Sequence, residues 1–374
     1  MPPLLPPPPR IEAYSRPDPK VVGLLTNPRA TPAQRLRACR YLVRFGRIGQ
    51  AVTAVSAMLE DPALRDEAED ILRQIRIVRK MGLDRDLRLA EAAASSPVTA
   101  GTAKGAARKV KRKKDVDGDA LEQDRGYWVV PAGSDTTLIA FTGKAMRLDI
   151  SIYFMQRLLS RFGLNVIYVF DWADAFYYGG VTGLGTNLRQ TTRSLRALCR
   201  ELGSKKVICF GQSTGGYAAI RYGVELKADG VLSFSPVILP VQKQRWLDHI
   251  ARKTGVRLQP REVDLRVVLE RVHRVPFTRI VYGDGNPADV RSARHLAGVT
   301  NVVEHALPGV TTHGTVEETT LAGTFPDILN DFCRDVGIRA GRRIRPRRAP
   351  SGKRSRESRA RAARRAPGDA DSPR

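Results

Sequence analysis

The chain of 374 residues carries a formal net charge of +25, and 42% of its residues are hydrophobic. Its length is ample for one large or two smaller domains with a buried core, so size does not limit the fold. The charge and the slightly low hydrophobic share exclude a chain that is folded throughout, and they predict polar, basic, unpacked segments. Residues 104–114 contain seven Lys or Arg and no acid, and residues 339–374 have a net charge of +11.

The cysteines and the N-terminus indicate the cellular setting. Four cysteines are scattered without a CxxC pair, which indicates reduced thiols and neither a disulfide frame nor a zinc site. The opening MPPLLPPPPR lacks a charged n-region and an apolar h-region. No stretch approaches the roughly eighteen apolar residues of a membrane-spanning helix. We therefore expect a cytoplasmic protein with no transmembrane segment. The oligomeric state does not follow from the sequence.

The first part of the chain is predicted to hold a small helical domain between two unfolded segments. Residues 1–30 are proline-rich and are expected to be extended and disordered. Residues 31–92 show apolar residues at helical spacing, and Thr31 and Asp61, each followed by proline, are typical helix starts. Residues 93–126 are rich in Ala, Gly, Ser and basic charge and are predicted to be a linker. Three helices are therefore expected, as a small domain or a cap.

Residues 127–337 alternate strand patterns with amphipathic helix patterns. Helix patterns include residues 187–202 and the stretch ADVRSARHLAG. Near-continuous apolar strands alternating with such helices predict an α/β fold with a doubly wound, mostly parallel sheet. The strand candidates are YWVVP, TLIAFTG, NVIYVFDW, KKVICFG, DGVLSFSP, TRIVYGD and NVVEHALPG.

Two further segments depart from this alternation. Residues 237–275 show helix patterns alone, so we expect an insertion that covers the strand ends as a lid. Residues 338–374 are Arg-rich with almost no apolar residues beyond alanine, and such a tail cannot bury enough surface to fold alone. It is expected to be disordered and to contact polyanions non-specifically, such as nucleic acid or an anionic membrane face. A solvated tail with no dedicated partner is the alternative.

The stretch KKVICFGQSTGGYAAIRYG, residues 205–223, passes from a strand pattern to a helix pattern through G-Q-S-T-G. Ser213 falls on this sharp turn, where the positions two residues to either side must be nearly free of side chains. Those positions are Gly211 and Gly215. The N–H of Thr214, at the helix N-terminus, would face a developing oxyanion. We interpret Ser213 as a nucleophile, and a structural Gly-Ser turn is the alternative.

With this strand, serine and helix motif, residues 127 to about 335 resemble proteins of the α/β-hydrolase fold. The resemblance implies a serine, an acid and a histidine in that chain order, each on the loop after a strand. It also implies an activity of the serine-esterase or acyltransferase type, with no metal and no organic cofactor.

The resemblance places the acid on the loop after the strand TRIVYGD. The usual position, three residues after the glycine that closes the strand, holds Asn286, which cannot carry the charge that stabilises an imidazolium. Asp284 and Asp289 flank it. We favour Asp289 as the acid, with Asp284 as the alternative. The structural alternatives are that Asp284 ends the strand and that Asp289 is a first-turn helix acid favoured by the dipole.

One histidine matches the position that the resemblance requires for the general base. His313, in LPGVTTHGTVEE, follows the last strand on a loop rich in Gly and Thr. His249 and His273 fall in the helical insertion, His295 in a helix, and His305 inside the last strand. His313 is therefore the predicted base, which would take the serine proton and return it to the leaving group.

The second oxyanion donor is expected on an early loop. In LIAFTGKAMRLD, Thr142-Gly143 stands where the family often has His-Gly, so the resemblance assigns the N–H of Lys144 or a near neighbour to the oxyanion hole with Thr214. The side chain of Lys144 is favoured as a solvated loop charge over a substrate ligand.

An aromatic loop, DWADAFYYGGVTGLG at residues 171–185, follows another strand end. Trp172, Tyr177 and Tyr178 beside four glycines are predicted to bind substrate, either a sugar ring or an acyl chain. The alternative is an aromatic anchor that packs the loop on the domain. Such loops also resemble those of hydrolase-fold proteins associated with bacterial surface glycans.

These features lead to a main hypothesis and two alternatives. The main hypothesis is a serine hydrolase that cleaves a carboxylic ester of a small molecule or glycan through an acyl-enzyme on Ser213. The nearest chemical alternative transfers the acyl group to a glycan hydroxyl, which depends on how well the lid excludes water. A non-catalytic hydrolase-fold protein that recruits partners is the other alternative, and Asn286 keeps it open.

Overall fold

The computed structural model describes residues 18–45, 47–80, 125–238 and 244–338. The expectations for residues 1–17, for the end of the helical domain (81–92), for most of the basic linker (93–124) and for the Arg-rich tail from residue 339 onward therefore lie outside the described residues. Within the described ranges no helix is both long and apolar enough to cross a membrane.

The three helices expected after residue 31 are present: α3 (Pro32–Arg44), α4 (Ile48–Ser56) and α5 (Arg65–Lys80). The Thr31 side chain accepts from the Gln34 N–H while the Gln34 side chain accepts from the Thr31 N–H, which forms a capping box at the start of α3. The apolar positions predicted from helical spacing turn inward. Buried examples from the three helices are Leu36, Leu42, Val55, Ala68 and Ile75.

Two expectations for this part are wrong in detail. The stretch expected to be disordered contains a short helix, α2 (Pro19–Gly23), because the Asp18 side chain accepts from the Lys20 N–H and Pro19 occupies the first helical position. The helix expected to start at Asp61 begins at Arg65 instead. Asp61 caps a turn, accepting from the Ala63 N–H at its side chain (2.9 Å) and from the Leu64 N–H at its carbonyl (3.0 Å).

Strands at the seven predicted segments form one sheet in the order β1-β3-β2-β4-β5-β6-β7. β1 pairs antiparallel with β3, and the other neighbouring pairs are parallel. The prediction of a doubly wound, mostly parallel sheet is confirmed. The strands are β1 (Tyr127–Val130), β2 (Thr136–Phe141), β3 (Asn165–Val169), β4 (Lys206–Gln212), β5 (Gly230–Phe234), β6 (Phe277–Gly283) and β7 (Val302–Leu307).

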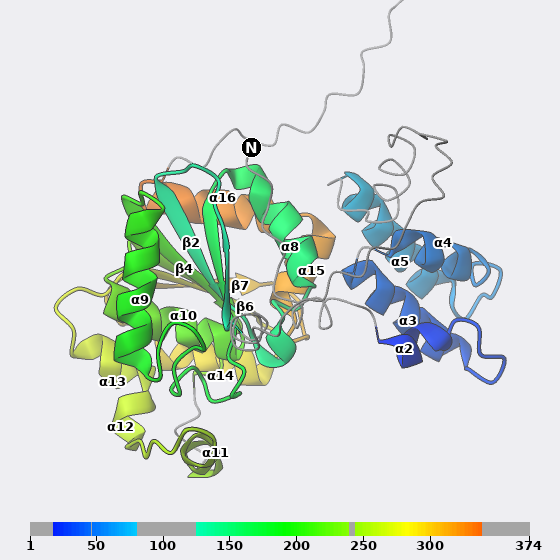
Figure 1. Ribbon diagram of the computed structural model, residues 1–374. Helices are drawn as coiled ribbons and strands as arrows, with labels where there is room; N and C mark the ends of the chain where they lie inside the picture. Colours follow the sequence, from blue (N-terminus) through cyan, green and yellow to red (C-terminus); the bar gives the residue numbers. More distant parts are fainter. Residues whose placement is uncertain (1–17, 46, 81–124, 239–243, 339–374) are drawn as a thin grey trace, which may run out of the picture. The chain divides into compact units, whose positions relative to one another are not determined.

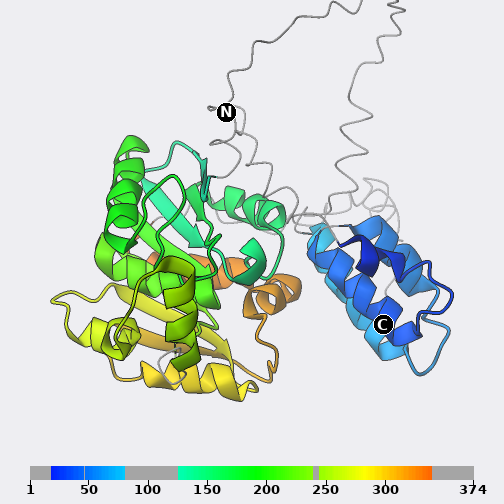
Figure 2. The ribbon, with the colours of Figure 1, turned by 60° about the horizontal axis from the view of Figure 1, so that its bottom comes forward.

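Different helices cover the two faces of this sheet (Figure 1, Figure 2). Successive strand residues point to opposite faces, so Leu138 and Ala140 join a core with α8 (Ile152–Leu159) and α16 (Phe325–Asp335). Ile139 and Phe141 join a second core with α9 and α10. The helices of the second core are α9 (Leu188–Glu201) and α10 (Thr214–Leu226). Further helices of the domain are α14 (Pro287–His295), α15 (Thr315–Ala322), and the short η1 (Lys144–Met146) and η2 (Ser160–Phe162).

The insertion predicted at 237–275 is helical over its described residues, with α11 (Gln244–Thr254), α12 (Pro260–Val263) and α13 (Leu265–Glu270). Leu265 and Leu269 are buried in the core shared with α10. Trp246 of α11 meets Phe176 of the aromatic loop edge-on, with 5.2 Å between ring centroids. The insertion therefore packs on the aromatic loop, and its action as a lid stays a prediction.

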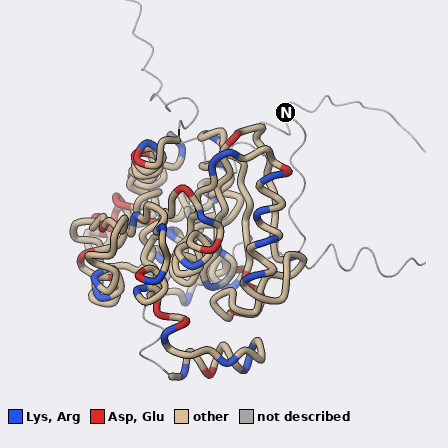
Figure 3. Tube along the Cα trace, turned by 90° about the vertical axis from the view of Figure 1, so that its left-hand side faces the viewer, with Lys and Arg blue, Asp and Glu red and all other residues tan. Residues whose placement is uncertain are grey.

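The helix α9 carries exposed basic residues on the surface of the folded domain. Leu195 and Cys199 of this helix are buried, whereas Arg193 and Arg200 are exposed on its outer side. The view from the α9 side shows basic residues following one another along a helix (Figure 3). This division of apolar and charged residues is the pattern of an amphipathic surface helix.

Candidate active site

Ser213 stands on the sharp turn between β4 and α10, as the sequence predicts. Its φ of 59° and ψ of −120° lie outside the regions that L-residues ordinarily adopt. Its N–H donates to the Phe234 carbonyl (3.0 Å), and its carbonyl accepts from the Val237 N–H (3.1 Å). The neighbouring segments of the chain thus hold the strained turn in place.

The two glycines of the motif are required by close backbone approach. A Cβ on Gly211 would lie 2.1 Å from the Gly215 carbonyl oxygen, and a Cβ on Gly215 would lie 2.1 Å from the Phe141 carbonyl oxygen. Neither distance is compatible with a side chain. The requirement for small residues, inferred from the motif, therefore has its cause in the packing of β4, α10 and the end of β2.

His313 lies beside the serine. Its Nε2 is 2.9 Å from Ser213 Oγ, and its Nδ1 is 2.7 Å from Asp289 Oδ1. With the neutral ring protonated on Nδ1, the histidine donates to Asp289 and accepts the Ser213 hydroxyl at Nε2. The Gln212 side chain, next to the serine, donates to the His313 carbonyl (3.3 Å) and links the two loops. The sequence analysis did not identify this role of Gln212.

The loop after β6 brings Asp289, and not Asp284, to the histidine. Asn286 caps α14, since its side chain accepts from the Ala288 and Asp289 N–H groups. Asp289 follows in the first turn of α14 and is 3% exposed, and its Oδ2 is buried with no hydrogen-bond partner among the described residues. Asp284 is exposed and accepts from the Gly309 N–H (2.7 Å). The alternative acid thus has a structural contact at the strand ends.

The serine therefore follows β4, the carboxylate follows β6 and the histidine follows β7, all at the carboxyl edge of a mostly parallel sheet. The domain has the α/β-hydrolase fold. The resemblance inferred from the elbow motif is confirmed.

No protein-family model and no curated protein sequence matches this chain. Among solved structures, it is similar to a propionate-bound esterase, Est2, from the Planctomycetes species Thermogutta terrifontis, at 15% identity over 58% of this chain and 91% of that chain, with a TM-score of 0.41. A truncated carbohydrate esterase from gut microbiota is similar at 14% identity over 56% of this chain and 96% of that chain, with a TM-score of 0.42. MenH from S. aureus is similar at 13% identity over 57% and 99%, with a TM-score of 0.38. The strand order and the site loops define the α/β-hydrolase fold independently of these likenesses.

The protonation of His313 depends on the groups around it, and its side chain is 43% exposed. The hydrogen bond to Asp289 raises the pKa of His313, partial burial opposes this rise, and the charges of Asp289 and Asp149 add to it. The environment therefore favours the imidazolium that forms when the histidine takes a proton.

Two backbone amides beside Ser213 can serve an oxyanion. Thr214 and Lys144 are the first residues of α10 and η1, and the N–H of a first helical residue has no acceptor within its helix. The backbone of Gly143, before Lys144, comes close to Ser213: a Cβ on it would lie 3.5 Å from Ser213 Cβ. The Lys144 side chain is exposed. This placement fits the predicted backbone donors and the interpretation of the side chain as a solvated charge.

The prediction that Tyr177 and Tyr178 bind substrate is corrected by their burial. They are 1% and 8% exposed. The Tyr177 hydroxyl donates to the Thr142 carbonyl (2.8 Å), and the Tyr178 hydroxyl lies 2.7 Å from that of Tyr217. The loop closes on itself because the buried Asp171 accepts from the Ala175 and Tyr177 N–H groups. The aromatic-anchor alternative accounts for both tyrosines.

Trp172 differs from these two tyrosines because it is only partly buried. Its ring stacks on Phe170 at 5.7 Å between centroids, and its Nε1–H donates to the Arg125 carbonyl (3.4 Å). A substrate contact of Trp172 stays a prediction.

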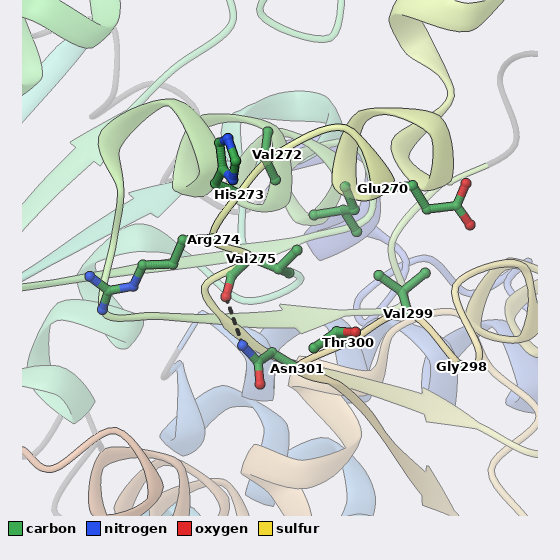
Figure 4. A pocket seen from close by; sticks show the side chains of 10 residues that line it. Glu270, Val272, His273, Arg274, Val275, Gly298, Val299, Thr300 and Asn301 are labelled. Atoms are coloured by element: carbon green, nitrogen blue, oxygen red, sulfur yellow. Dashed lines mark hydrogen bonds between the residues drawn. The ribbon is translucent and has the colours of Figure 1, made fainter.

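A cavity of about 390 Å³ lies away from this site (Figure 4). It is lined by residues 269, 270 and 272–275, before β6, and residues 298–301, before β7. These are the amino ends of two parallel strands, opposite the edge that carries Ser213. Figure 4 shows Glu270 and Arg274 directed apart, and Asn301 donates to the Val275 carbonyl (3.1 Å). The cavity therefore lacks the convergent polar groups of a binding site.

Proposed function

We propose that the domain at residues 125–338 is a serine hydrolase that cleaves carboxylic esters through an acyl-enzyme. The observation that carries the proposal is the unbroken hydrogen-bonded chain from Ser213 through His313 to Asp289, with contacts of 2.9 and 2.7 Å. A nucleophile, a base and a buried carboxylate in this order are the parts that acyl transfer to serine requires.

Each step follows from the contacts. Ser213 Oγ attacks the ester carbonyl carbon while its proton passes to His313 Nε2, and Asp289 stabilises the resulting imidazolium. The carbonyl oxygen becomes an oxyanion that accepts from the N–H groups of Thr214 and Lys144. The imidazolium then protonates the leaving alcohol as the C–O bond breaks. Water repeats the sequence on the acyl-enzyme and releases the acid.

At the level of sequence Asn286 kept the non-catalytic alternative open, because it occupies the usual position of the acid. Its side chain caps α14 through the Ala288 and Asp289 N–H groups, and this cap presents Asp289, three residues further on, to His313. A displaced acid is thus available, which favours an enzyme over a recruiting module.

The substrate class is the less constrained part of the proposal. Because Tyr177 and Tyr178 are buried, most of the aromatic platform predicted to bind a sugar ring or an acyl chain is removed from the substrate side. We therefore propose hydrolysis of a small-molecule ester before glycan ester hydrolysis or acyl transfer to a glycan.

The deciding experiment combines covalent labelling with turnover. The purified protein is treated with a fluorophosphonate and assayed on a series of p-nitrophenyl esters. Ser213→Ala is expected to abolish both signals. Ser194→Ala is a matched control, because this serine lies on α9 and donates to the Leu184 carbonyl (2.6 Å). Absence of labelling and turnover in folded wild-type protein would overturn the proposal.

A further inference from the structure

A second carboxylate, Asp149, lies beside the proposed base and has no part in the proton transfers described above. It comes from the loop after η1, the same segment that presents the Lys144 N–H. Its Oδ2 accepts from the N–H of Val316 at 3.2 Å, across 167 residues of chain. Val316 is the second residue of α15, which begins directly after His313 and Gly314. One side chain thus connects the oxyanion segment to the histidine segment.

The start of α15 needs such a partner. Its N-cap residue, Gly314, has no side chain to accept a hydrogen bond from the first turn. Asp149 performs this capping from a distant part of the chain. A Cβ on Gly314 would lie 3.8 Å from Asp149 Cγ and 3.6 Å from Glu317 Oε2. Two carboxyl groups therefore converge on the backbone next to His313.

The backbone at Asp149 is held in an uncommon conformation. Its φ of 63° lies in the left-handed region, and the flanking residues Leu148 and Ile150 form an antiparallel bridge. Aspartate tolerates this region better than most residues, and strain of this kind persists only where the surroundings impose it. The tight bend is what brings the carboxylate to α15.

The groups that face Asp149 make its charge dependent on pH. Partial burial and the nearby Glu317 carboxylate raise the pKa of Asp149 to about 7, while His313 and the Val316 and Glu317 N–H groups oppose this rise. His313 and Asp149 each favour the charged form of the other.

We propose that Asp149 is a positioning residue that fastens the histidine loop to the oxyanion loop and, when ionised, supports protonation of His313 during attack by Ser213. The proposal rests on the hydrolase function proposed above. Asp149 receives no proton in the reaction: the Ser213 proton still moves to His313 Nε2, and Asp149 acts through its charge and its hydrogen bond.

The test uses the full chain with Asp149→Asn, which keeps an acceptor for the Val316 N–H and removes the charge. Asp284→Asn is the matched control, because Asp284 also accepts from a loop N–H near the strand ends but is exposed. The pKa of His313 is read by NMR titration of the imidazole signals, with His313→Gln identifying its resonance among the five histidines. Hydrolysis of p-nitrophenyl acetate is measured at about pH 6 and about pH 8.

Asp149→Asn is expected to lower the pKa of His313. It is also expected to reduce kcat about three- to tenfold at the higher pH and less at the lower pH, where wild-type Asp149 is itself largely neutral. Asp284→Asn is expected to change neither quantity. An unchanged His313 pKa in Asp149→Asn, together with an equal effect on kcat at both pH values, would show that Asp149 is only a helix cap. Because the NMR titration needs no turnover, it decides the inference even if the protein proves not to be a hydrolase.

Discussion

Among the described residues, two histidine–aspartate pairs have similar short distances, whereas His249 and Asp174 are 4.0 Å apart. His313 Nδ1 is 2.7 Å from Asp289, and His295 Nε2 is 2.8 Å from Asp264. Only the first pair has a serine hydroxyl on the remaining ring nitrogen, at 2.9 Å. A contact between an imidazole and a carboxylate is therefore not sufficient to identify the candidate active site.

The surroundings of the second pair explain it as structure. Asp264 also caps α13 by accepting from the Arg266 N–H (3.0 Å), and Arg266 donates to the His295 carbonyl (3.0 Å). His295 lies in the last turn of α14, where a positive charge is favoured by the helix dipole. This pair ties α13 of the insertion to α14, whereas the first pair lies beside the strained Ser213, the proposed nucleophile.

Replacing each histidine gives the largest contrast between the two pairs. His313→Gln removes the proposed base and is expected to lower kcat by about 10⁵ or more. His295→Gln is expected to leave kcat within about twofold, since its ring contacts only structural groups. The measurement is hydrolysis of p-nitrophenyl acetate by the two purified variants. Equal losses in both would contradict the assignment of His313 as the base.

The carboxylate of the first pair is expected to have the next largest effect. Asp289→Asn can donate its amide to His313 Nδ1, which places the ring proton on Nε2 and prevents that atom from accepting the serine proton. The expected loss in kcat is about 10³ to 10⁴. The same assay, with fluorophosphonate labelling rates, measures it. Activity close to wild type would mean that another carboxylate orients His313.

The pH dependence of kcat/KM tests the pair of His313 and Asp289 further. The pKa of His313 is raised above its ordinary value of about 6.5, chiefly by Asp289. Only the neutral ring can act as base, so kcat/KM is expected to rise with pH through a value above 6.5 and to fall about tenfold per unit below it. A rate profile from about pH 5 to about pH 9 tests this. A midpoint below the ordinary value would contradict the described surroundings of His313.

The raised pKa of His313 affects the free energy of unfolding in the opposite pH direction to its effect on the rate. Protonated His313 is favoured in the folded state, so its contribution to the free energy of unfolding is fully present below the unfolded-state pKa. It is lost as pH rises through the folded-state pKa. The pair with Asp289 therefore stabilises the fold most where the proposed base is protonated and inactive.

The sequence was sufficient for the sheet and for the position of Ser213 on the strand-to-helix turn, because both depend on local patterns. Apolar strands bounded by turn residues identified the seven strands, and glycines two residues either side of Ser213 identified the elbow. The acid was ambiguous because a loop can return either Asp284 or Asp289 to the same histidine. The contact between Asp289 and His313 favours Asp289, and it depends on the Asn286 cap and so on where α14 begins.

Other features depend on contacts between distant segments. Tyr177 and Tyr178 beside glycines suit a binding loop as well as an anchor, and their burial results from the insertion and α10 packing over them. The contact between Asp149 and Val316 spans 167 residues and has no motif in the sequence. Gln212 was an unremarked residue of the elbow, although its contact with the His313 carbonyl links the two site loops.

The smallest expected effect belongs to the carboxylate of the second pair. Asp264→Asn retains an oxygen that can cap α13, so the free energy of unfolding is expected to fall by less than about 1 kcal/mol. Hydrolysis should stay within about twofold of wild type, because the hydrogen-bond partners of Asp264 among the described residues, Arg266 and His295, lie outside the proposed site. Urea denaturation and the ester assay on one preparation measure both quantities. A large loss of activity without a loss of stability would mean that the insertion helices transmit a signal to Ser213, and the two pairs would then no longer be functionally separate.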